Sequence, residues 1–291
     1  MKVLVTGASG QLGTDIVKVL EYYKVVPLTH TDIDITDFHA VKGACFKHKP
    51  DVIVNTAAYV RVDDCETNQD LAFRVNALGA RNIAVVAEEL GSKLAHISTD
   101  YIFGGESGVC STPYTEFDTP VPLSTYGKSK LAGEEFVRSL CRRHFIIRTS
   151  ALFGLAGSSG KGGNFIETIL RLAQERDELA VVNDQVFSPT YTPDLAIKIS
   201  QLIRTELYGT YHITNSGTCS WYGFARETLR LASSGTSVLP IPSAEYPQKA
   251  KRPTYSVLGH YHLRLLNMDD IRSWQEALAE YMTEKGHNSK Q

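Results

Sequence analysis

Thr99, Tyr126 and Lys130 have side chains of the types that could pass a proton to a reacting oxygen atom. Tyr126 and Lys130 are four residues apart, so on a helix they would lie on the same face. Because an ammonium group stabilises a phenolate, we expect Lys130 to lower the pKa of Tyr126 from its ordinary value of about 10. Such a phenol could protonate a developing alkoxide near neutral pH. The spacing alone is more typical of a solvated helix face, so the chemistry depends on what surrounds it.

Two predicted elements would position these side chains. A strand over residues 93–98 delivers Thr99 to its carboxyl end, and a helix is predicted over residues 126–141. The stretch 104–125 between them is rich in Gly, Pro, Ser and Thr, and we expect it to form a loop over the site. Ligands of open α/β sheets bind along the carboxyl edge of the strands. The hydroxyl and the phenol are therefore predicted to meet at that edge.

The chain begins with a short strand, residues 2–6, that runs into a glycine-rich turn and then a helix. In this context Gly7 permits the tight turn, Gly10 lets the backbone approach a pyrophosphate, and Gly13 allows close packing of helix on strand. The helix N-terminus offers free N–H groups and a positive dipole to the phosphates. The residues expected to hold a dinucleotide here are Gly7, Gly10, Gln11, Leu12 and Gly13.

A second strand is predicted over residues 24–28, buried on both faces. At its end a dinucleotide fold often carries an acidic residue for the 2′-hydroxyl of the adenosine ribose. Here Thr29-His30-Thr31 follows the strand, so nothing repels a 2′-phosphate. NADPH is therefore mildly favoured, with NADH left open, and Asp34 and Ile35 are expected near the adenine ring.

A third strand is predicted over residues 51–55, and Ala57, Ala58 and Tyr59 follow it. Small residues just past the carboxyl end of a strand let a cofactor lie close to the backbone, so these three are assigned to cofactor binding. The next helix is predicted over residues 69–90, with Asn76 in its middle.

Strands and helices alternate as far as residue 150, which predicts an α/β fold with a Rossmann-like, doubly wound parallel sheet. Residues 151–285 are predicted to form mostly a smaller, interleaved substrate-binding lobe, with the segment 190–215 returning to the sheet. Residues 286–291 are expected to be a disordered tail. Within the second half, the predicted features are helices at 164–175, 193–205, 220–231 and 272–283, a strand at 180–182 and a polar turn at 183–190.

Composition excludes several classes of protein. The 291 residues carry a net charge of about −2 with no long basic run, which argues against nucleic-acid binding. No apolar stretch is long enough to span a membrane, and the N-terminus lacks the pattern of a secretory signal. Histidines have no carboxylate or cysteine neighbours at ligand spacing, so no structural metal is predicted. The scattered cysteines indicate free thiols in a cytoplasmic protein; they are Cys45, Cys65, Cys110, Cys141 and Cys219.

Taken together, these motifs resemble the extended short-chain dehydrogenase/reductase family, and within it the dTDP-4-dehydrorhamnose reductases. The similarity covers nearly the whole chain. Its most specific parts are the Ser-Thr-Asp-Tyr and Asn-Asp-Gln elements. The residues that carry it lie at 10–13, 51–55, 62–66, 98–103, 126–134, 148–150, 163–165, 183–185 and 252–253.

The resemblance implies NAD(P)H-dependent reduction of the 4-keto group of dTDP-4-dehydro-β-L-rhamnose, which gives dTDP-β-L-rhamnose for cell-surface polysaccharide. It further implies that Tyr126 donates the proton, that Lys130 holds the nicotinamide ribose, and that Thr99 binds the ketone oxygen. Asp100 would meet sugar hydroxyls, although a helix or turn cap is an alternative role for it. Arg252 is carried over as a further substrate-binding residue.

Two features depart from the family pattern. Better-known members carry a substrate-packing tryptophan where this chain has Ala151. Phe187, which precedes Ser188-Pro189-Thr190, could replace that aromatic surface or simply fill the core. Some members bind Mg²⁺ at a dimer contact, but no matching carboxylates are found here, and a homodimer is left open.

Two other functions fit parts of the pattern. The first is a different sugar-nucleotide 4-ketoreductase, for example one that forms a 6-deoxytalose with the same catalytic residues. The second is a non-catalytic regulatory protein that resembles the β subunit of methionine adenosyltransferase. A purely regulatory chain need not retain Thr99, Tyr126 and Lys130 together, which favours the enzyme.

Overall fold

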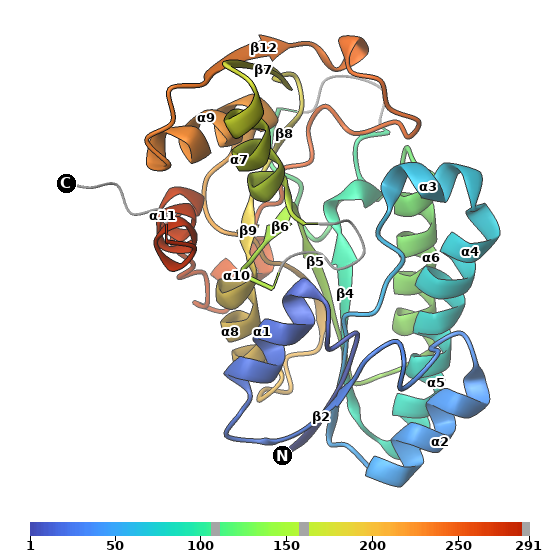
Figure 1. Cartoon of the computed structure of the whole chain (residues 1–291). Coiled ribbons are helices and arrows are strands. Elements are labelled where there is room, and N and C mark those ends of the chain that lie inside the picture. The colour runs from blue at the N-terminus through green and yellow to red at the C-terminus, as the bar shows by residue number, and fades with distance from the viewer. Residues whose placement is uncertain (106–110, 157–162, 287–291) are drawn as a thin grey trace.

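The computed structural model describes residues 1–105, 111–156 and 163–286, and a six-stranded parallel sheet lies at its centre (Figure 1). After β1 the chain adds β2 on one side of it and then returns past β1 to add β3 on the other side. The topological switch therefore lies between β1 and β3, where doubly wound folds bind their ligands. The predicted α/β class and doubly wound sheet are confirmed. In spatial order the strands are β10 (Gly209–His212), β5 (His144–Thr149), β4 (Lys93–Thr99), β3 (Val52–Asn55), β1 (Lys2–Thr6) and β2 (Lys24–Leu28).

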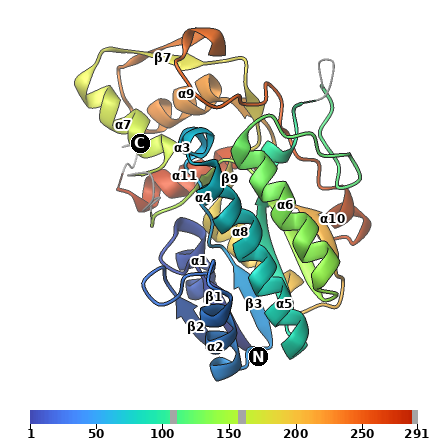
Figure 2. The same ribbon diagram turned by 90° about the vertical axis from the view of Figure 1, so that its right-hand side faces the viewer.

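Helices cover both faces of this sheet (Figure 2). Alternate residues of β1 point to opposite faces of the sheet, so Val3 and Val5 pack into one hydrophobic core and Leu4 packs into the other. The helices on the first face are α1 (Gln11–Val19) and α8 (Thr192–Leu202), with α10 (Tyr261–Leu265) beside β10. Those on the second face are α2 (Phe38–His48), α5 (Ala80–Leu90) and α6 (Thr125–Leu140).

β2 was predicted to be buried on both faces, and this is wrong. It is the last strand of the sheet, and its five residues are only partly buried or exposed. Pro27 lies in this strand, where an edge position tolerates the missing N–H group. Apolar content alone did not distinguish an edge strand from a central one.

The helix predicted over residues 69–90 is interrupted. It is divided into α4 (Gln69–Phe73), a π-helical turn η1 (Arg74–Gly79) and α5, and a short helix α3 (Val62–Thr67) precedes it. π-Turns inside helices are rare and frequently lie at functional sites. The Asn76 side chain in this turn bonds to the backbone of Tyr59 and to Ser129 of α6, as described below.

A smaller layer of helices and short strands lies above the carboxyl edge of the sheet, at the top of Figure 1. Its core is rich in aromatic side chains such as Phe153, Phe224 and Trp274. The predicted helices of this half are confirmed to within a few residues. Its elements are α7 (Phe165–Glu175), α9 (Trp221–Leu231), α11 (Trp274–Glu284), the paired strands β7 (Glu178–Val182) and β12 (Ser237–Ile241), and the short helix η3 (Ser243–Glu245).

The segment predicted as a polar turn at 183–190 contains two short strands instead. Each pairs with another short strand, which ties the upper layer to the loops above the sheet. The pairs are β8 (Val186–Phe187) with β11 (Cys219–Ser220), and β9 (Thr190–Tyr191) with β6 (Leu152–Phe153). The tail predicted to be disordered lies largely outside the described residues.

Candidate active site

A cavity of about 960 Å³ lies along the carboxyl edge of the sheet and continues between the sheet and the upper layer. It brings together all but one of the residues that the sequence assigned to a site. Those that line it are Gly7, Gly10, Gln11, Leu12, Gly13, Asp34, Ile35, Ala57, Ala58, Tyr59, Thr99, Asp100, Tyr126, Lys130, Ala151 and Phe187. The exception is Arg252.

The glycine turn has no room for side chains at two positions. Gly7 has a φ of +70°, which L-residues rarely adopt. A Cβ atom on Gly13 would lie 2.2 Å from the carbonyl oxygen of Gly7, so the turn can pass this close to α1 only with glycine there. Gly10 is the N-cap of α1 and offers no capping side chain to the first N–H groups of the helix. This arrangement fits a pyrophosphate at the helix N-terminus.

The end of β2 carries no carboxylate that points freely into the cavity. Thr29 and His30 line the cavity, whereas the Asp32 carboxylate accepts hydrogen bonds from the backbone and hydroxyl of Thr29. Asp34 also lines the cavity, and the backbone N–H of Thr36 holds the pKa of its carboxyl below the ordinary value.

The loop after β3 is fixed from two sides. Asn55 accepts a hydrogen bond from the backbone N–H of Ala57, and Asn76 accepts one from the N–H of Tyr59 at 2.8 Å. Asn76 also donates to the carbonyl of Tyr59 and to the hydroxyl of Ser129. The π-turn thereby links the cavity wall to α6, between Tyr126 and Lys130.

Thr99, Tyr126 and Lys130 converge from β4 and α6 on the same part of the cavity. Thr99 caps η2 (Asp100–Ile102) by accepting a hydrogen bond from the N–H of Tyr101, and its hydroxyl donates to the Asp100 carboxylate. The buried Lys130 ammonium donates to the carbonyl of Ile97 at 2.6 Å. Burial lowers the pKa of Lys130 to about 8.

The expected lowering of the Tyr126 pKa is wrong for this structure. Loss of contact with water raises the pKa of the phenol above its ordinary value, and this effect outweighs the lowering effect of the Thr99 hydroxyl. Lys130 is directed to a backbone carbonyl rather than to the phenol. Spacing on a helix face predicted the shared location of the two groups but not the balance of these effects.

Asp100 is buried and is not a cap, so that alternative is excluded. Its carboxylate accepts hydrogen bonds from Ser150 at 2.8 Å, from Ser256 at 2.6 Å and from Thr99 at 3.1 Å. Burial raises the pKa of Asp100 to about 6, against these hydrogen bonds. It therefore joins the ends of β4 and β5 to the segment around Ser256.

Arg252 is not among the residues that line the cavity, so the structure does not place it with the other candidate substrate residues. Its guanidinium forms an ion pair with Asp63 at 2.7 Å and also bonds to Gln248. Asp63 in turn accepts hydrogen bonds from the backbone of Lys249 and Ala250. The pair ties α3 to the C-terminal segment, while the neighbouring Pro253 lines the cavity.

The two roles considered for Phe187 are not exclusive, because this side chain is 3% exposed in the aromatic core and also lines the cavity. Ala151 lies nearby with a φ of +41°, an unusual conformation for a residue with a Cβ atom. Strained backbone of this kind is frequent at functional sites.

A buried ion pair fixes α6 to the sheet. The Glu134 carboxylate accepts hydrogen bonds from Nε and a terminal nitrogen of Arg148, at 2.8–3.2 Å, and from Ser98 at 2.5 Å. Both partners are almost fully buried. Since Glu134 lies one turn beyond Lys130, the pair holds the helix that carries the candidate catalytic groups.

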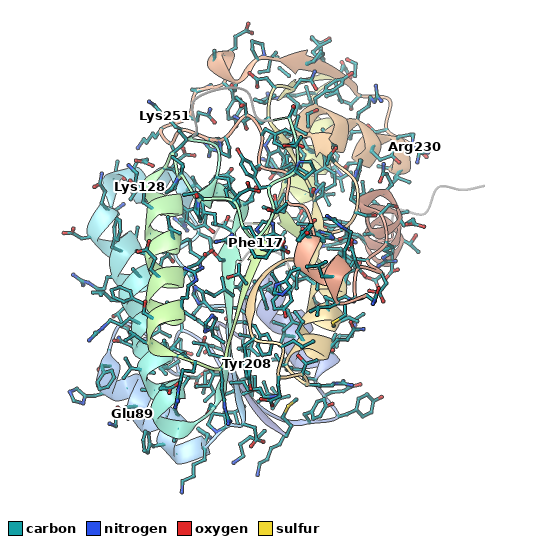
Figure 3. All side chains as sticks on the ribbon, turned by 180° about the vertical axis from the view of Figure 1, so that it is seen from behind. Glu89, Phe117, Lys128, Tyr208, Arg230 and Lys251 are labelled. Carbon is teal, nitrogen blue, oxygen red and sulfur yellow. The ribbon has the colours of Figure 1, made fainter. Side chains whose placement is uncertain are left out.

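The described part of the loop predicted over the site does not border the cavity. Residues 104–105 and 111–124, the part of this segment that the structure describes, do not line the cavity. Instead Tyr114 stacks on Phe103 and bridges to Leu258, and the exposed Phe117, labelled in Figure 3, contacts Tyr261. Pro and Gly content predicted a loop without indicating the surface on which it packs.

Several cavity residues were not predicted. One of them is Thr149, whose buried hydroxyl has no hydrogen-bond partner among the described residues; the side-chain oxygen of Gln11, a residue that was predicted, also has none. Phe165 and Trp221 line its upper end. Each begins a helix with a strong amphipathic pattern, so the sequence indicated core packing and gave no separate signal for a site.

Over residues 1–105, 111–156 and 163–286, no group of three or more His, Cys, Asp and Glu side chains is arranged to hold a metal ion. In the same ranges, no helix has the length and apolar character needed to cross a bilayer. Cys45, Cys141 and Cys219 are free thiols, and Cys110 lies outside the described residues.

Comparison with known proteins gives a consistent match. The model of the RmlD substrate binding domain family matches residues 1–286. A curated relative, the spore coat polysaccharide biosynthesis protein SpsK of Bacillus subtilis (strain 168), is 42% identical over 98% of both chains. A dTDP-4-keto-6-deoxy-D-glucose reductase of Streptomyces niveus is 40% identical over 95% of both chains.

Solved structures agree with these relatives. The crystal structure of a dTDP-4-dehydrorhamnose reductase from Bacillus anthracis str. Ames in complex with NADP superimposes with a TM-score of 0.92 at 43% identity. The match covers 97% of this chain and 99% of that one.

Proposed function

We propose that this chain, which belongs to the dTDP-4-dehydrorhamnose reductase family, reduces dTDP-4-dehydro-β-L-rhamnose to dTDP-β-L-rhamnose with NADPH. The observation that carries this proposal is the convergence of Thr99, Tyr126 and Lys130 with a glycine turn on one cavity. A strand-edge hydroxyl, a phenol and an ammonium are the groups needed to bind and protonate a ketone oxygen.

The glycine turn is assigned to the pyrophosphate of NADPH. The absence of space for a Cβ at Gly13, the uncapped start of α1 and the unpaired Gln11 oxygen all fit a bound dinucleotide. When bound, the nicotinamide supplies the hydride that reduces C4 of the sugar. Thr29 and His30 favour NADPH, and separate dissociation constants for NADPH and NADH test this preference.

Tyr126 is assigned as the proton donor. Its raised pKa keeps the phenol protonated at neutral pH, so the proton is available when the alkoxide forms. The resulting phenolate must be stabilised, and the groups assigned to do so are the Thr99 hydroxyl, which acts to lower the pKa of Tyr126, and the Lys130 ammonium. Thr99 is also assigned to the ketone oxygen.

Asp100 and Ala151 are assigned to the sugar side of the cavity. Asp100 lines it while holding Ser150 and Ser256, so it can orient Thr99 as well as accept from a sugar hydroxyl. Arg252 is assigned a positioning role through Asp63 in place of direct substrate contact.

We also propose the division of the chain that the sequence suggested, with residues 1–150 and the returning segment 190–215 forming the dinucleotide-binding part. The upper layer then forms most of the substrate-binding part. The expected location is the cytoplasm. Light scattering of the purified protein tests whether it forms a homodimer.

The function is tested by following NADPH absorbance with dTDP-4-dehydro-L-rhamnose as substrate. We expect substrate-dependent oxidation of NADPH. Binding of NADPH without turnover would refute the proposed reductase activity. That outcome would favour the regulatory alternative.

A second candidate, another nucleotide-sugar 4-ketoreductase, is favoured by two observations. The Streptomyces niveus relative carries the name of a reductase for a different dTDP-4-keto sugar. Ala151 leaves one part of the sugar wall with a small side chain. A product with the talo configuration at C4 would select this candidate.

A further inference from the structure

The start of α6 is held by a carboxylate from a neighbouring helix. Glu66, in α3, accepts a hydrogen bond from the backbone N–H of Thr125 at 2.8 Å and another from the Thr125 hydroxyl at 2.9 Å. Thr125 is the first residue of α6 and is 7% exposed, and Tyr126 follows it directly. α3 lies beside the upper end of α6 (Figure 1). The residue next to the assigned proton donor is therefore fixed by a contact from outside its own helix.

The Glu66 carboxylate satisfies groups that α6 cannot satisfy by itself. The first N–H groups of a helix have no partner within it. Ser124, the N-cap, accepts from the N–H of Gly127 at 3.2 Å, so the N–H of Thr125 needs an acceptor from elsewhere. Without the carboxylate, Thr125 would keep two donors in a place that water hardly reaches, which is unfavourable. We therefore expect the first turn of α6 to shift when this contact is lost.

The same turn is packed closely against the end of β4. A Cβ atom on Gly127 would lie 2.1 Å from the carbonyl oxygen of Tyr101. The rings of Tyr126 and Tyr101 meet edge to face, with 5.8 Å between their centroids. Tyr101 lies in η2, two residues after Thr99. A small movement of the turn would therefore change the position of the Tyr126 phenol relative to the Thr99 hydroxyl.

α3 is itself anchored, so Glu66 acts from a fixed support. The neighbouring Asp63 forms the ion pair with Arg252 at 2.7 Å. The buried Cys65 thiol contacts the carbonyl oxygen of Tyr59 at 3.9 Å. One short helix thus joins the C-terminal segment, the loop after β3 and the start of α6.

We propose that Glu66 is a positioning residue, which holds the first turn of α6 so that the Tyr126 phenol meets the ketone oxygen bound at Thr99. This inference rests on the proposed function, in which Tyr126 donates the proton. In the described part of the chain, neither Glu66 nor Thr125 lines the cavity, so Glu66 acts through Tyr126. A misplacement of about 1 Å in a reacting group can cost about 100-fold in rate.

The experiment measures kcat with NADPH and dTDP-4-dehydro-L-rhamnose, below the melting transition of each variant. Glu66→Ala should lower kcat by about 5- to 50-fold and leave the NADPH dissociation constant nearly unchanged. Glu66→Asp should behave similarly, because a shorter side chain cannot reach both donors. Glu66→Gln should stay within about threefold of the wild type, since an amide can accept from the N–H and donate to the hydroxyl. A pure charge effect on the helix dipole would give the opposite order.

A second measurement separates positioning from stability. If proton transfer is slowed, the solvent deuterium isotope effect on kcat should be larger for Glu66→Ala than for the wild type. The matched control is Glu276→Ala, because Glu276 accepts from the N–H and hydroxyl of Ser273 at the start of α11, at 2.9 and 2.6 Å. α11 does not line the described cavity, so this variant should melt earlier but keep the wild-type kcat and isotope effect.

Thr125→Val removes only the hydroxyl donor. It should lower kcat by about 2- to 5-fold, so the inference stays testable where Glu66→Ala does not fold.

The outcomes separate this inference from the proposed function. If the wild type reduces the substrate and both Glu66→Ala and Thr125→Val keep its kcat, the positioning role is refuted and the reductase stands. An unchanged isotope effect with a melting loss like that of Glu276→Ala would show that Glu66 only stabilises the fold, and a wild-type rate for Glu66→Asp would show that charge is sufficient. Either result overturns the inference. If the wild type does not reduce the substrate, both fall.

Discussion

Replacement of Glu134 by glutamine tests how α6, the helix that carries Tyr126 and Lys130, is held on the sheet. The Glu134 carboxylate is fully buried, and the Arg148 side chain that donates to it is 3% exposed. Removing one member of such a pair leaves an uncompensated buried charge, which costs about 3–5 kcal/mol. Glutamine keeps the shape and one accepting oxygen, so we expect the lower end, about 3 kcal/mol.

The assay is urea unfolding of wild type and Glu134→Gln, combined with a thermal scan. The expected loss corresponds to a melting temperature lower by roughly 5–10 °C for a chain of this size. Glu88→Gln is the matched control, since its partner Arg142 is 91% exposed and such surface pairs contribute about 0–1 kcal/mol. A Glu134→Gln variant within about 1 kcal/mol of wild type would refute the idea that this pair anchors the helix.

Three further predictions concern the site. Tyr126→Phe should lower kcat by about 10²–10⁴-fold while the NADPH dissociation constant stays nearly unchanged; unimpaired turnover would remove Tyr126 from the proton-donor role. Burial raises the pKa of Asp100 from 3.8 to about 6, so its ionisation destabilises the folded state as pH rises through this range. The unfolding free energy of Asp100→Asn relative to wild type should therefore increase by up to about 3 kcal/mol between pH 4 and 7, and a pH-independent difference would contradict this. Gly13→Ala places a Cβ against the Gly7 carbonyl and should weaken NADPH binding roughly tenfold or more, as measured by fluorescence titration, whereas equal affinity would show that the turn can relax.

The sequence predicted the doubly wound sheet and its edge because both depend on local patterns. The glycine turn, each short strand and the Tyr126/Lys130 spacing can be recognised from a few consecutive residues. Strand order then follows from the general topology of such sheets, and the carboxyl edge brings Thr99 and Ala58 to one cavity.

What the sequence missed depends on contacts between distant residues. The π-turn around Asn76 is tied to Tyr59 and Ser129, and neither contact leaves a pattern in residues 69–90. Arg252 was expected to contact substrate, but its guanidinium forms an ion pair with Asp63, which lies 189 residues away in the sequence. The Tyr126 pKa depends on how completely the fold removes water, which helix spacing does not report.

The position of Trp221 illustrates the same limit. Trp221 begins an amphipathic helix, and its sequence context is that of a core residue. Only the packing of α9 against β8 and α7 shows that the indole also borders the cavity.

In the proposed reaction this chain transfers a hydride from NADPH to C4 of dTDP-4-dehydro-L-rhamnose. The most direct measurement uses NADPH deuterated at C4 of the nicotinamide and determines the product by NMR. We expect deuterium at C4 of the sugar, in the rhamno configuration, with one NADPH oxidised per product formed. No deuterium in the sugar despite bound NADPH would contradict the reductase, and a talo product would contradict the proposed substrate stereochemistry.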